Sequence, residues 1–144
     1  MKEKLKEVTL YCDGSSLGNP GAGGYGGFLD YKGKTKVFSG GAKNVTNNQM
    51  ELKAVIEGLK LLKEPCSVTV VTDSSYVANA INSWLENWIK KGFKGVKNIN
   101  LWEEYIEASK NHQVKAKWVR GHNGHKENEF CDKLAREEAL KYKS

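Results

Sequence analysis

Four carboxylates are the residues of this chain best suited to chemistry: Asp13, Glu51, Asp73 and Asp132. Asp13 follows the apolar run 8–12 and Asp73 follows the run 68–72, and each acid precedes a small turn residue. Both are therefore expected at the carboxyl end of a strand. Glu51 and Asp132 fall in segments with helical patterns. Acids gathered in one pocket of a chain whose net charge is +6 would suit metal-dependent chemistry on nucleic acid.

A mixed α/β order is expected to bring these acids together. Apolar runs predict strands over 7–13, 26–31, 35–41, 67–72 and 114–119. Helical spacing predicts helices over 48–63, 74–82, 101–110 and 126–141. The crossover through the first of these helices places strand 67–72 parallel to strand 7–13, so Asp13 and Asp73 should meet at the edge where open α/β sheets bind ligands.

Glu51 and Asp132 each allow a plainer interpretation. Glu51 is expected in the first turn of helix 48–63, where it could reach the acid pocket or form a capping box with Asn48. Asp132 could join the pocket or be a solvated acid on a surface helix. Converging like charges raise each other's pKa and cost stability unless a cation neutralises them, and oxygen-only ligands suit a hard cation such as Mg²⁺.

Length and composition favour one domain over residues 1–144, with a core that needs no metal or disulfide for stability. The three cysteines have no tight spacing, which predicts buried thiols in a reducing compartment: Cys12, Cys66 and Cys131. The charged first seven residues and the absence of an apolar run near twenty residues predict a cytoplasmic protein with no membrane contact.

Positive charge gathers in a basic segment at about residues 84–100. Four lysines stand there against one acid, Glu86: Lys90, Lys91, Lys94 and Lys97. Trp84, Trp88 and Phe93 lie among them. Interleaved basic and aromatic residues favour nucleic-acid contact, although a solvated helix pair whose tryptophans belong to the core would give the same pattern.

Several unlinked motifs occur in one order along the chain. They are Asp13-Gly14-Ser15-Ser16 with Gly18-Asn19-Pro20-Gly21, then Thr46-Asn47-Asn48-Gln49-Met50-Glu51, then Thr72-Asp73-Ser74, then Trp118-Val119-Arg120-Gly121-His122 with Asn128-Glu129 and Cys131-Asp132. On these motifs the chain resembles a bacterial-type, type 1 ribonuclease H from about residue 7 to residue 140. The resemblance implies the ribonuclease H-like α/β fold, a five-stranded mixed sheet of three antiparallel and then parallel strands, flanked by helices.

The resemblance also implies the activity. In this family the four acids hold two Mg²⁺ ions, for which Mn²⁺ can substitute, and the enzyme cuts the RNA strand of an RNA–DNA hybrid. Two ions about 3.5–4 Å apart activate the attacking water and stabilise the departing 3′ oxygen, so the products carry 5′-phosphate and 3′-hydroxyl ends. The expected partner is the hybrid duplex, and the expected state is a monomer.

Roles for the remaining site residues follow from the same resemblance. His122 matches a mobile histidine that moves protons, although a plain loop histidine is the alternative. Asn19, Asn47 and Asn48 match readers of the ribose 2′-hydroxyl, whereas Thr46 and Asn98 match a pocket for a phosphate of the DNA strand. The basic segment matches the family's protruding handle, which contributes these substrate contacts: Trp84, Trp88, Lys90, Lys91, Lys94 and Lys97.

Three alternatives from other classes stay open. A hybrid-binding module without nuclease activity is disfavoured because all four acids are present. A strand transferase or junction resolvase of the same fold is disfavoured because the handle and the asparagines match the hybrid cutters. A general nucleic-acid-binding protein is the third. Incubation with Mg²⁺ and labelled RNA–DNA, RNA–RNA, DNA–DNA and four-way-junction substrates separates these classes.

Overall fold

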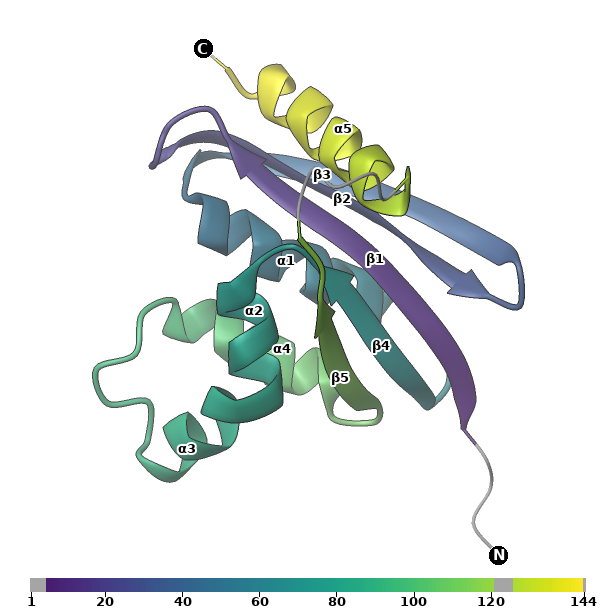
Figure 1. The fold of residues 1–144 in the computed structure, drawn as a ribbon. Coiled ribbons are helices and arrows are strands. Elements are labelled where there is room, and N and C mark those ends of the chain that lie inside the picture. The colour runs from purple at the N-terminus through teal and green to yellow at the C-terminus, as the bar shows by residue number, and fades with distance from the viewer. Residues whose placement is uncertain (1–4, 121–125, 144) are drawn as a thin grey trace, which may run out of the picture.

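A computed structural model describes residues 5–120 and 126–143. Figure 1 shows one sheet with helices on both of its faces. The strands are β1 (Lys6–Ser16), β2 (Gly21–Tyr31), β3 (Lys34–Val45), β4 (Cys66–Thr72) and β5 (Gln113–Trp118). The helices are α1 (Asn47–Lys60), α2 (Ser75–Asn79), the π-helix η1 (Ala80–Trp84), α3 (Leu85–Lys90), α4 (Ile99–Ser109) and α5 (Lys126–Lys141).

The sheet has the predicted mixed topology. Its strand order is β3-β2-β1-β4-β5, with antiparallel pairs between the first three strands of the chain and parallel pairs from β1 to β4 and from β4 to β5. Val8 and Leu10 stand beside Val68 and Val70 in the β1–β4 register. The prediction that the helical crossover makes β4 parallel to β1 is confirmed.

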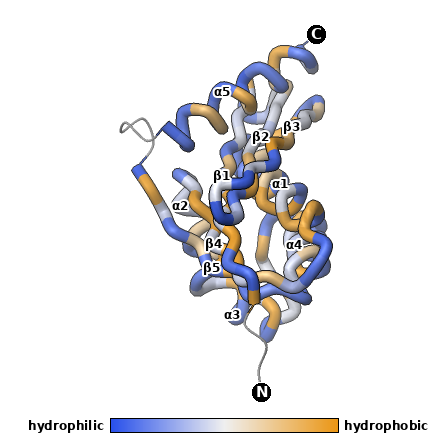
Figure 2. Tube along the Cα trace, turned by 90° about the vertical axis from the view of Figure 1, so that its right-hand side faces the viewer, coloured by the Kyte–Doolittle hydropathy of each residue, from blue (hydrophilic) through white to orange (hydrophobic). Residues whose placement is uncertain are grey.

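The helices form two unequal layers. α1 packs on β1 and β2 and against α4, whereas α5 packs on β1, β2 and β3 (Figure 1). Figure 2 shows hydrophobic and hydrophilic residues in turn along α5, as a helix with one buried stripe requires. Gly24 of β2 allows this close approach, because a Cβ there would lie 2.2 Å from the backbone oxygen of Ala135 in α5.

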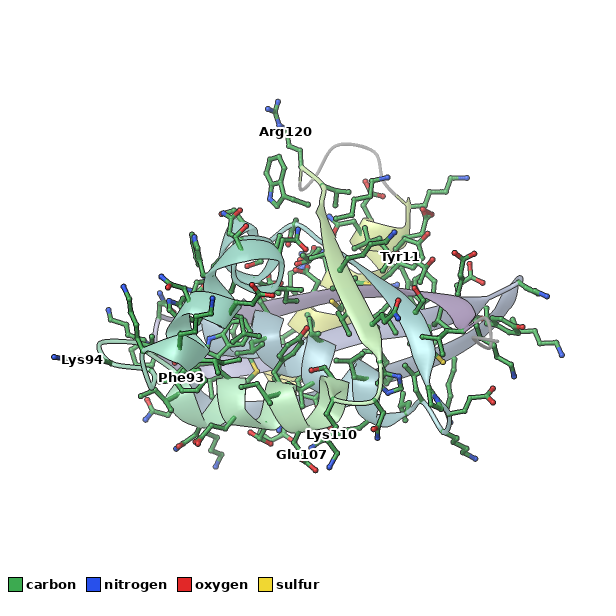
Figure 3. All side chains as sticks on the ribbon, turned by 90° about the horizontal axis from the view of Figure 1, so that it is seen from below. Tyr11, Phe93, Lys94, Glu107, Lys110 and Arg120 are labelled. Carbon is green, nitrogen blue, oxygen red and sulfur yellow. The ribbon has the colours of Figure 1, made fainter. Side chains whose placement is uncertain are left out.

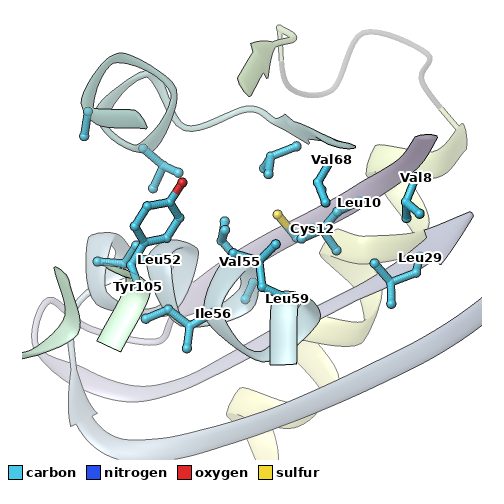
Figure 4. Close-up of a cluster of buried hydrophobic side chains, with 14 of the residues drawn as sticks. Val8, Leu10, Cys12, Leu29, Leu52, Val55, Ile56, Leu59, Val68 and Tyr105 are labelled. Atoms are coloured by element: carbon cyan, nitrogen blue, oxygen red, sulfur yellow. The ribbon is translucent and has the colours of Figure 1, made fainter. Parts of the chain in front are cut away.

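The core lies between the sheet and the layer of α1 and α4. Leu10 from β1, Val68 from β4, Val55 from α1 and Trp102 from α4 are all fully buried in it. Figure 4 shows α1 side chains meeting those of the strands. The cysteines are buried free thiols, as predicted. Within residues 5–120 and 126–143, no helix is long and apolar enough to cross a membrane.

Several element ends differ from the predictions. β1 continues to Ser16, so Asp13 lies inside the strand and not at its end. α1 begins at Asn47 because Thr46 is its N-cap, in a capping box completed by Gln49. The predicted short helix 74–82 is three consecutive elements, α2, η1 and α3, which reach Lys90 without a break.

The outer edge of β5 is held by a side chain. Asn82 of η1 donates from Nδ2 to the backbone oxygen of Ala116 at 2.8 Å, and its Oδ1 accepts from the backbone N–H of Ala116 at 2.9 Å. The amide therefore pairs with Ala116 as a neighbouring strand would. At the start of β4, His112 Nδ1 accepts from the backbone N–H of Cys66 at 3.0 Å.

Candidate active site

Three of the four predicted acids converge in space. Asp13, Glu51 and Asp73 each offer an oxygen within 4.8 Å of the others. Asp132 lies outside this trio but lines the same open cavity of about 390 Å³, together with Asn48 and other residues. Asp13 and Glu51 are buried, while Asp73 and Asp132 are partly exposed. The cavity therefore presents acids to a ligand that arrives from solvent.

The strand arrangement explains how Asp13 and Asp73 meet. The β1–β4 register ends at Tyr11 and Val71, two residues before each acid. Beyond that point β1 pairs only with β2, where Asp13 stands opposite Gly26, so its β4 side is open. Asp73 follows β4 directly, as predicted.

Glu51 reaches the acids from α1, and its predicted place in the helix was wrong. It is the fifth residue of α1 and not part of the first turn. The alternative capping box with Asn48 is also wrong, because Thr46 and Gln49 form the box. Glu51 is 8% exposed and its Oε2 has no hydrogen-bond partner among the described residues. A buried carboxylate oxygen without a partner is costly, so capping does not account for this acid.

Burial and the neighbouring acids disfavour the ionised form of the carboxyl groups in this cavity. Burial is the main cause that raises the pKa of Asp13 to about 8, and the charge of Asp73 adds to it. Burial also raises the pKa of Glu51 well above its usual range, with the charge of Asp13 as the next cause. The backbone of Gly14 lowers the pKa of Glu51 and offsets part of this effect. Oxygen ligands, an unpartnered oxygen and raised carboxyl pKa values together fit a hard divalent cation.

Asp132 has a partner within its own helix. Its Oδ2 lies 3.0 Å from Nε of Arg136, one turn further along α5. The Asp132 side chain is 22% exposed and that of Arg136 is 64% exposed, so solvent screens the pair. Asp132 therefore combines the predicted position in the acid cavity with the surface ion pair expected of a solvated helix acid.

Two of the asparagines hold the connection between β1 and β2 against the start of α1. Asn47 Oδ1 accepts from the backbone N–H of Ser16 at 2.7 Å, and Asn19 Oδ1 accepts from the backbone N–H of Asn47 at 3.1 Å. Because a backbone N–H can only donate, the amide oxygens must face inward and the exposed NH₂ groups face outward. Asn47 and Asn48 both line the acid cavity. The arrangement leaves amide donors beside the acids.

A hydrogen-bond chain joins the two predicted phosphate-pocket residues. Gln49 accepts from the Thr46 backbone N–H with Oε1 at 2.9 Å and donates from Nε2 to Asn98 Oδ1 at 3.2 Å. Asn98 then donates to the Tyr76 hydroxyl at 3.3 Å, which also accepts from Trp102 Nε1 at 2.9 Å. Gln49 and Tyr76 were not predicted as site residues. The Thr-x-x-Gln spacing of a capping box was the available signal for Gln49.

The basic segment stands off the sheet, with α3 and the following loop at one side of the molecule (Figure 1). Its four lysines are all exposed: Lys90, Lys91, Lys94 and Lys97. Figure 3 shows Lys94 at the far end of this loop. Trp84 is 42% exposed, whereas the Trp88 ring packs on Trp102 with centroids 5.5 Å apart. Trp88 thus has the anchoring contact that the core alternative described. His122 lies outside the described residues.

Comparison with known proteins gives the family. The family model described as RNase H matches residues 5–140. The chain belongs to the ribonuclease H family. It is 64% identical over 143 residues to the ribonuclease H of Sulfurovum sp. (strain NBC37-1), covering 99% of this chain and 97% of that protein. It is 57% identical over 137 residues to the ribonuclease HI of Helicobacter pylori (strain ATCC 700392 / 26695), covering 95% and 96%.

Solved structures agree with this assignment to ribonuclease H. LC9-RNase H1, a type 1 RNase H with the type 2 active-site motif, superposes with a TM-score of 0.89 at 31% identity, covering 98% of this chain and 75% of that one. The predicted resemblance and the predicted fold class are therefore confirmed. Membership of the ribonuclease H family indicates ribonuclease activity on RNA–DNA hybrids.

Proposed function

We propose that this chain is an endoribonuclease that hydrolyses the RNA strand of RNA–DNA hybrids by two-metal-ion catalysis, leaving 5′-phosphate and 3′-hydroxyl ends. The observation that carries the proposal is the convergence of Asp13, Glu51 and Asp73 within 4.8 Å. Buried acids that have no basic partner within the trio do not stabilise the fold, but their oxygens are suitable ligands for a metal ion. A monomeric state and a cytoplasmic location stay predictions.

Asp13, Glu51 and Asp73 would hold the metal ions, with Asp132 as the fourth acid of the cavity. Bound there, two Mg²⁺ ions, or Mn²⁺ in their place, would activate a water and stabilise the departing 3′ oxygen. β1 positions Asp13, the end of β4 positions Asp73, and α1 positions Glu51. His122 would carry a proton to or from the reacting oxygens, because an imidazole titrates near neutral pH.

Substrate choice would come from the exposed amides. Asn19, Asn47 and Asn48 would donate to ribose 2′-hydroxyls, the groups that distinguish RNA from DNA. Thr46 and Asn98, fixed through Gln49, would receive a phosphate of the DNA strand. The exposed lysines of the basic segment would neutralise further phosphates, with Trp84 beside them. The three asparagines, the lysines and Trp84 are exposed, and Thr46 and Asn98 are partly exposed.

One set of substrates tests the proposal. Purified protein with Mg²⁺ should cut the RNA strand of a labelled RNA–DNA hybrid and leave RNA–RNA, DNA–DNA and a four-way junction nearly intact. End-labelling of the products should show 5′-phosphates and 3′-hydroxyls, and chelation of the metal should stop the reaction. Cleavage of RNA–RNA as fast as the hybrid would refute the substrate assignment while leaving the metal chemistry intact.

Removal of 2′-hydroxyls from the substrate should reveal whether the asparagines contact the ribose. An unpartnered polar group costs about 1–3 kcal/mol, so replacing one 2′-hydroxyl beside the cut by hydrogen should slow the wild type by roughly 5- to 150-fold. Asn48→Ala should cut the all-RNA hybrid more slowly but lose less from the deoxy substitution, because that contact is already missing. Single-turnover rates of the four combinations measure the coupling. Strictly additive losses would contradict a direct contact.

Neutralising the basic segment should affect binding more than chemistry. Replacing Lys90, Lys91, Lys94 and Lys97 with alanine should raise KM, flatten its dependence on salt and change kcat far less, because fewer counterions are released on binding. A matched control removes four exposed lysines at the other end of the sheet: Lys32, Lys34, Lys36 and Lys63. If both quadruple variants shift KM equally, net charge and not the basic segment governs binding.

A further inference from the structure

The chain runs from Asp73 of the acid cavity through α2 and η1 into the basic segment, and β5 adds a second, hydrogen-bonded connection between the two places. Trp118 at the end of β5 donates from Nε1 to the backbone oxygen of Asp73 at 3.0 Å, and Val119 donates its N–H to the oxygen of Thr72 at 2.9 Å. The last residues of β5 are therefore attached to the chain around a metal-binding acid.

The other contact of β5 leads to the basic segment. Both peptide groups of Ala116 bond the side-chain amide of Asn82, at 2.8 and 2.9 Å. Asn82 lies in η1, which turns directly into α3 at Leu85. Ala116 precedes Trp118 by two residues, which is roughly 6.6 Å along an extended strand. Asn82 and Asp73 thus form hydrogen bonds with two nearby residues of β5, Ala116 and Trp118.

We propose that Asn82 is a positioning residue that fixes the basic segment at a set distance from the acid cavity. The inference rests on the proposed function, because it assumes that one hybrid contacts both places. A π-helix is an irregular turn that often marks a functional position, and η1 lies between α2 and α3, directly before the segment. Two hydrogen bonds from one amide to one residue restrain both the distance and the orientation of that turn.

The other contacts of the basic segment are made with helices and do not replace the hydrogen bonds of Asn82. Trp84 and Trp88 are tilted against each other with centroids 5.9 Å apart, and Trp88 meets Trp102 of α4 edge-on. Aromatic contacts hold the segment against α4, and Asn98 accepts a hydrogen bond from Gln49 of α1, but neither contact joins the segment to the sheet. Within the described residues, Asn82 makes the side-chain hydrogen bonds that join the start of the segment to the sheet.

The test compares two RNA–DNA hybrids. The long one reaches both the acid cavity and the basic segment, whereas the short one reaches the cavity alone. In the wild type, kcat/KM should be higher for the long hybrid because a bound segment holds the RNA strand in place for cleavage. Asn82→Ala should reduce this long-to-short ratio by about 5-fold or more, the effect of losing two hydrogen bonds, and leave the short hybrid unaffected.

Two further variants make the test specific. Asn79→Ala removes an exposed asparagine on the preceding helix and should behave as the wild type. Asn82→Asp keeps the acceptor for the Ala116 N–H and loses the donor, so the ratio should be intermediate. Exchange of the Ala116 amide proton with solvent should be fast in Asn82→Ala and slower in Asn82→Asp, which verifies the contact independently of activity. Asn82→Asp also carries the test if the alanine variant does not fold.

Adding Asn82→Ala to the variant without the four lysines of the basic segment should not lower the ratio again, because both changes act through the segment. An unchanged ratio in Asn82→Ala would overturn the inference, as would an equal loss on the long and short hybrids, which indicates general destabilisation. A wild type that cuts neither hybrid would instead refute the proposed function. The two failures are therefore distinguishable.

Discussion

Replacing Asp13 with asparagine is expected to remove nearly all hybrid cleavage and, in metal-free buffer, to make the protein more stable than the wild type. Asp13 is the most enclosed acid of the trio, at 3% exposed. Metal ions stabilise transition-state charge by several kcal/mol, and each tenfold in rate is about 1.4 kcal/mol, so activity should fall by on the order of 10³-fold or more. The structural cost of the buried charge should disappear in the same variant.

The pH dependence of stability follows from the raised pKa. The folded state raises the pKa of Asp13 from 3.8 to about 8, so the fold binds this proton more tightly than the unfolded chain does. Without metal, the free energy of unfolding should therefore decrease as pH rises from about 4 to about 8. Asp13→Asn should flatten this decrease and raise Tm near neutral pH by roughly 5 °C, on the order of 2 kcal/mol.

Melting curves in chelator between about pH 5 and 8 measure this effect for both proteins. Glu103→Gln, which changes an exposed acid on α4, is the matched control and should alter neither activity nor the pH dependence. Saturating Mg²⁺ should reverse the order of stability, because the wild type gains a bound cation that the variant holds less well. Near-normal turnover by Asp13→Asn, with an unchanged melting curve, would exclude the metal-site assignment.

Gly14→Ala is expected to inactivate the enzyme without touching any acid. A Cβ on Gly14 would lie 2.3 Å from the backbone N of Glu51 and 2.3 Å from the carbonyl carbon of Met50, so α1 must move away from β1. That movement carries Glu51 away from Asp13, the neighbouring acid of the trio. A displacement near 1 Å at a catalytic group costs about 10²-fold, and overpacking costs about 1–3 kcal/mol of stability.

Single-turnover rates, Tm and the Mg²⁺ concentration for half-maximal activity should all worsen together in Gly14→Ala. Gly33→Asn is the matched control, because nothing lies within 4 Å of a Cβ there and asparagine tolerates a positive φ. It should keep nearly full activity. A Gly14→Ala protein with lowered Tm but normal metal dependence would show that the contact with α1 supports the fold and not the site.

The strands and the parallel crossover were predictable because each carries a local apolar pattern. The glycine-rich stretch after Asp13 was not. The residues between the predicted strands 7–13 and 26–31 contain the end of β1 and the start of β2. Gly24 and Gly26 are there because α5 lies on them, with Ala135 and Leu134 where a Cβ would stand. A glycine needed for close approach cannot be distinguished locally from one needed for a turn.

The site also contains residues that the sequence predicts and residues that it does not. Asp73 was predictable because a strand ends beside it. The capping box was ambiguous, because Thr46 with Gln49 and Asn48 with Glu51 both match the spacing, and the hydrogen bonds between Thr46 and Gln49 decide between them. The role of Asn82 could not be predicted from the residues around it in the sequence. Its partner Ala116 is 34 residues away, and such pairing depends on the sheet being assembled first.

The pair formed by Asn82 and Ala116 has a consequence for self-association. The last strand of an open sheet presents unpaired peptide groups, which can recruit a strand from another molecule. On β5, the Asn82 amide already occupies the peptide groups of Ala116 in the middle of that strand. At the opposite end of the sheet, exposed Lys34 and Lys36 place like charges on β3. Both edges of the sheet are therefore protected against pairing with the sheet of another molecule. Several copies bound side by side on one nucleic acid should not assemble into a filament through their sheets.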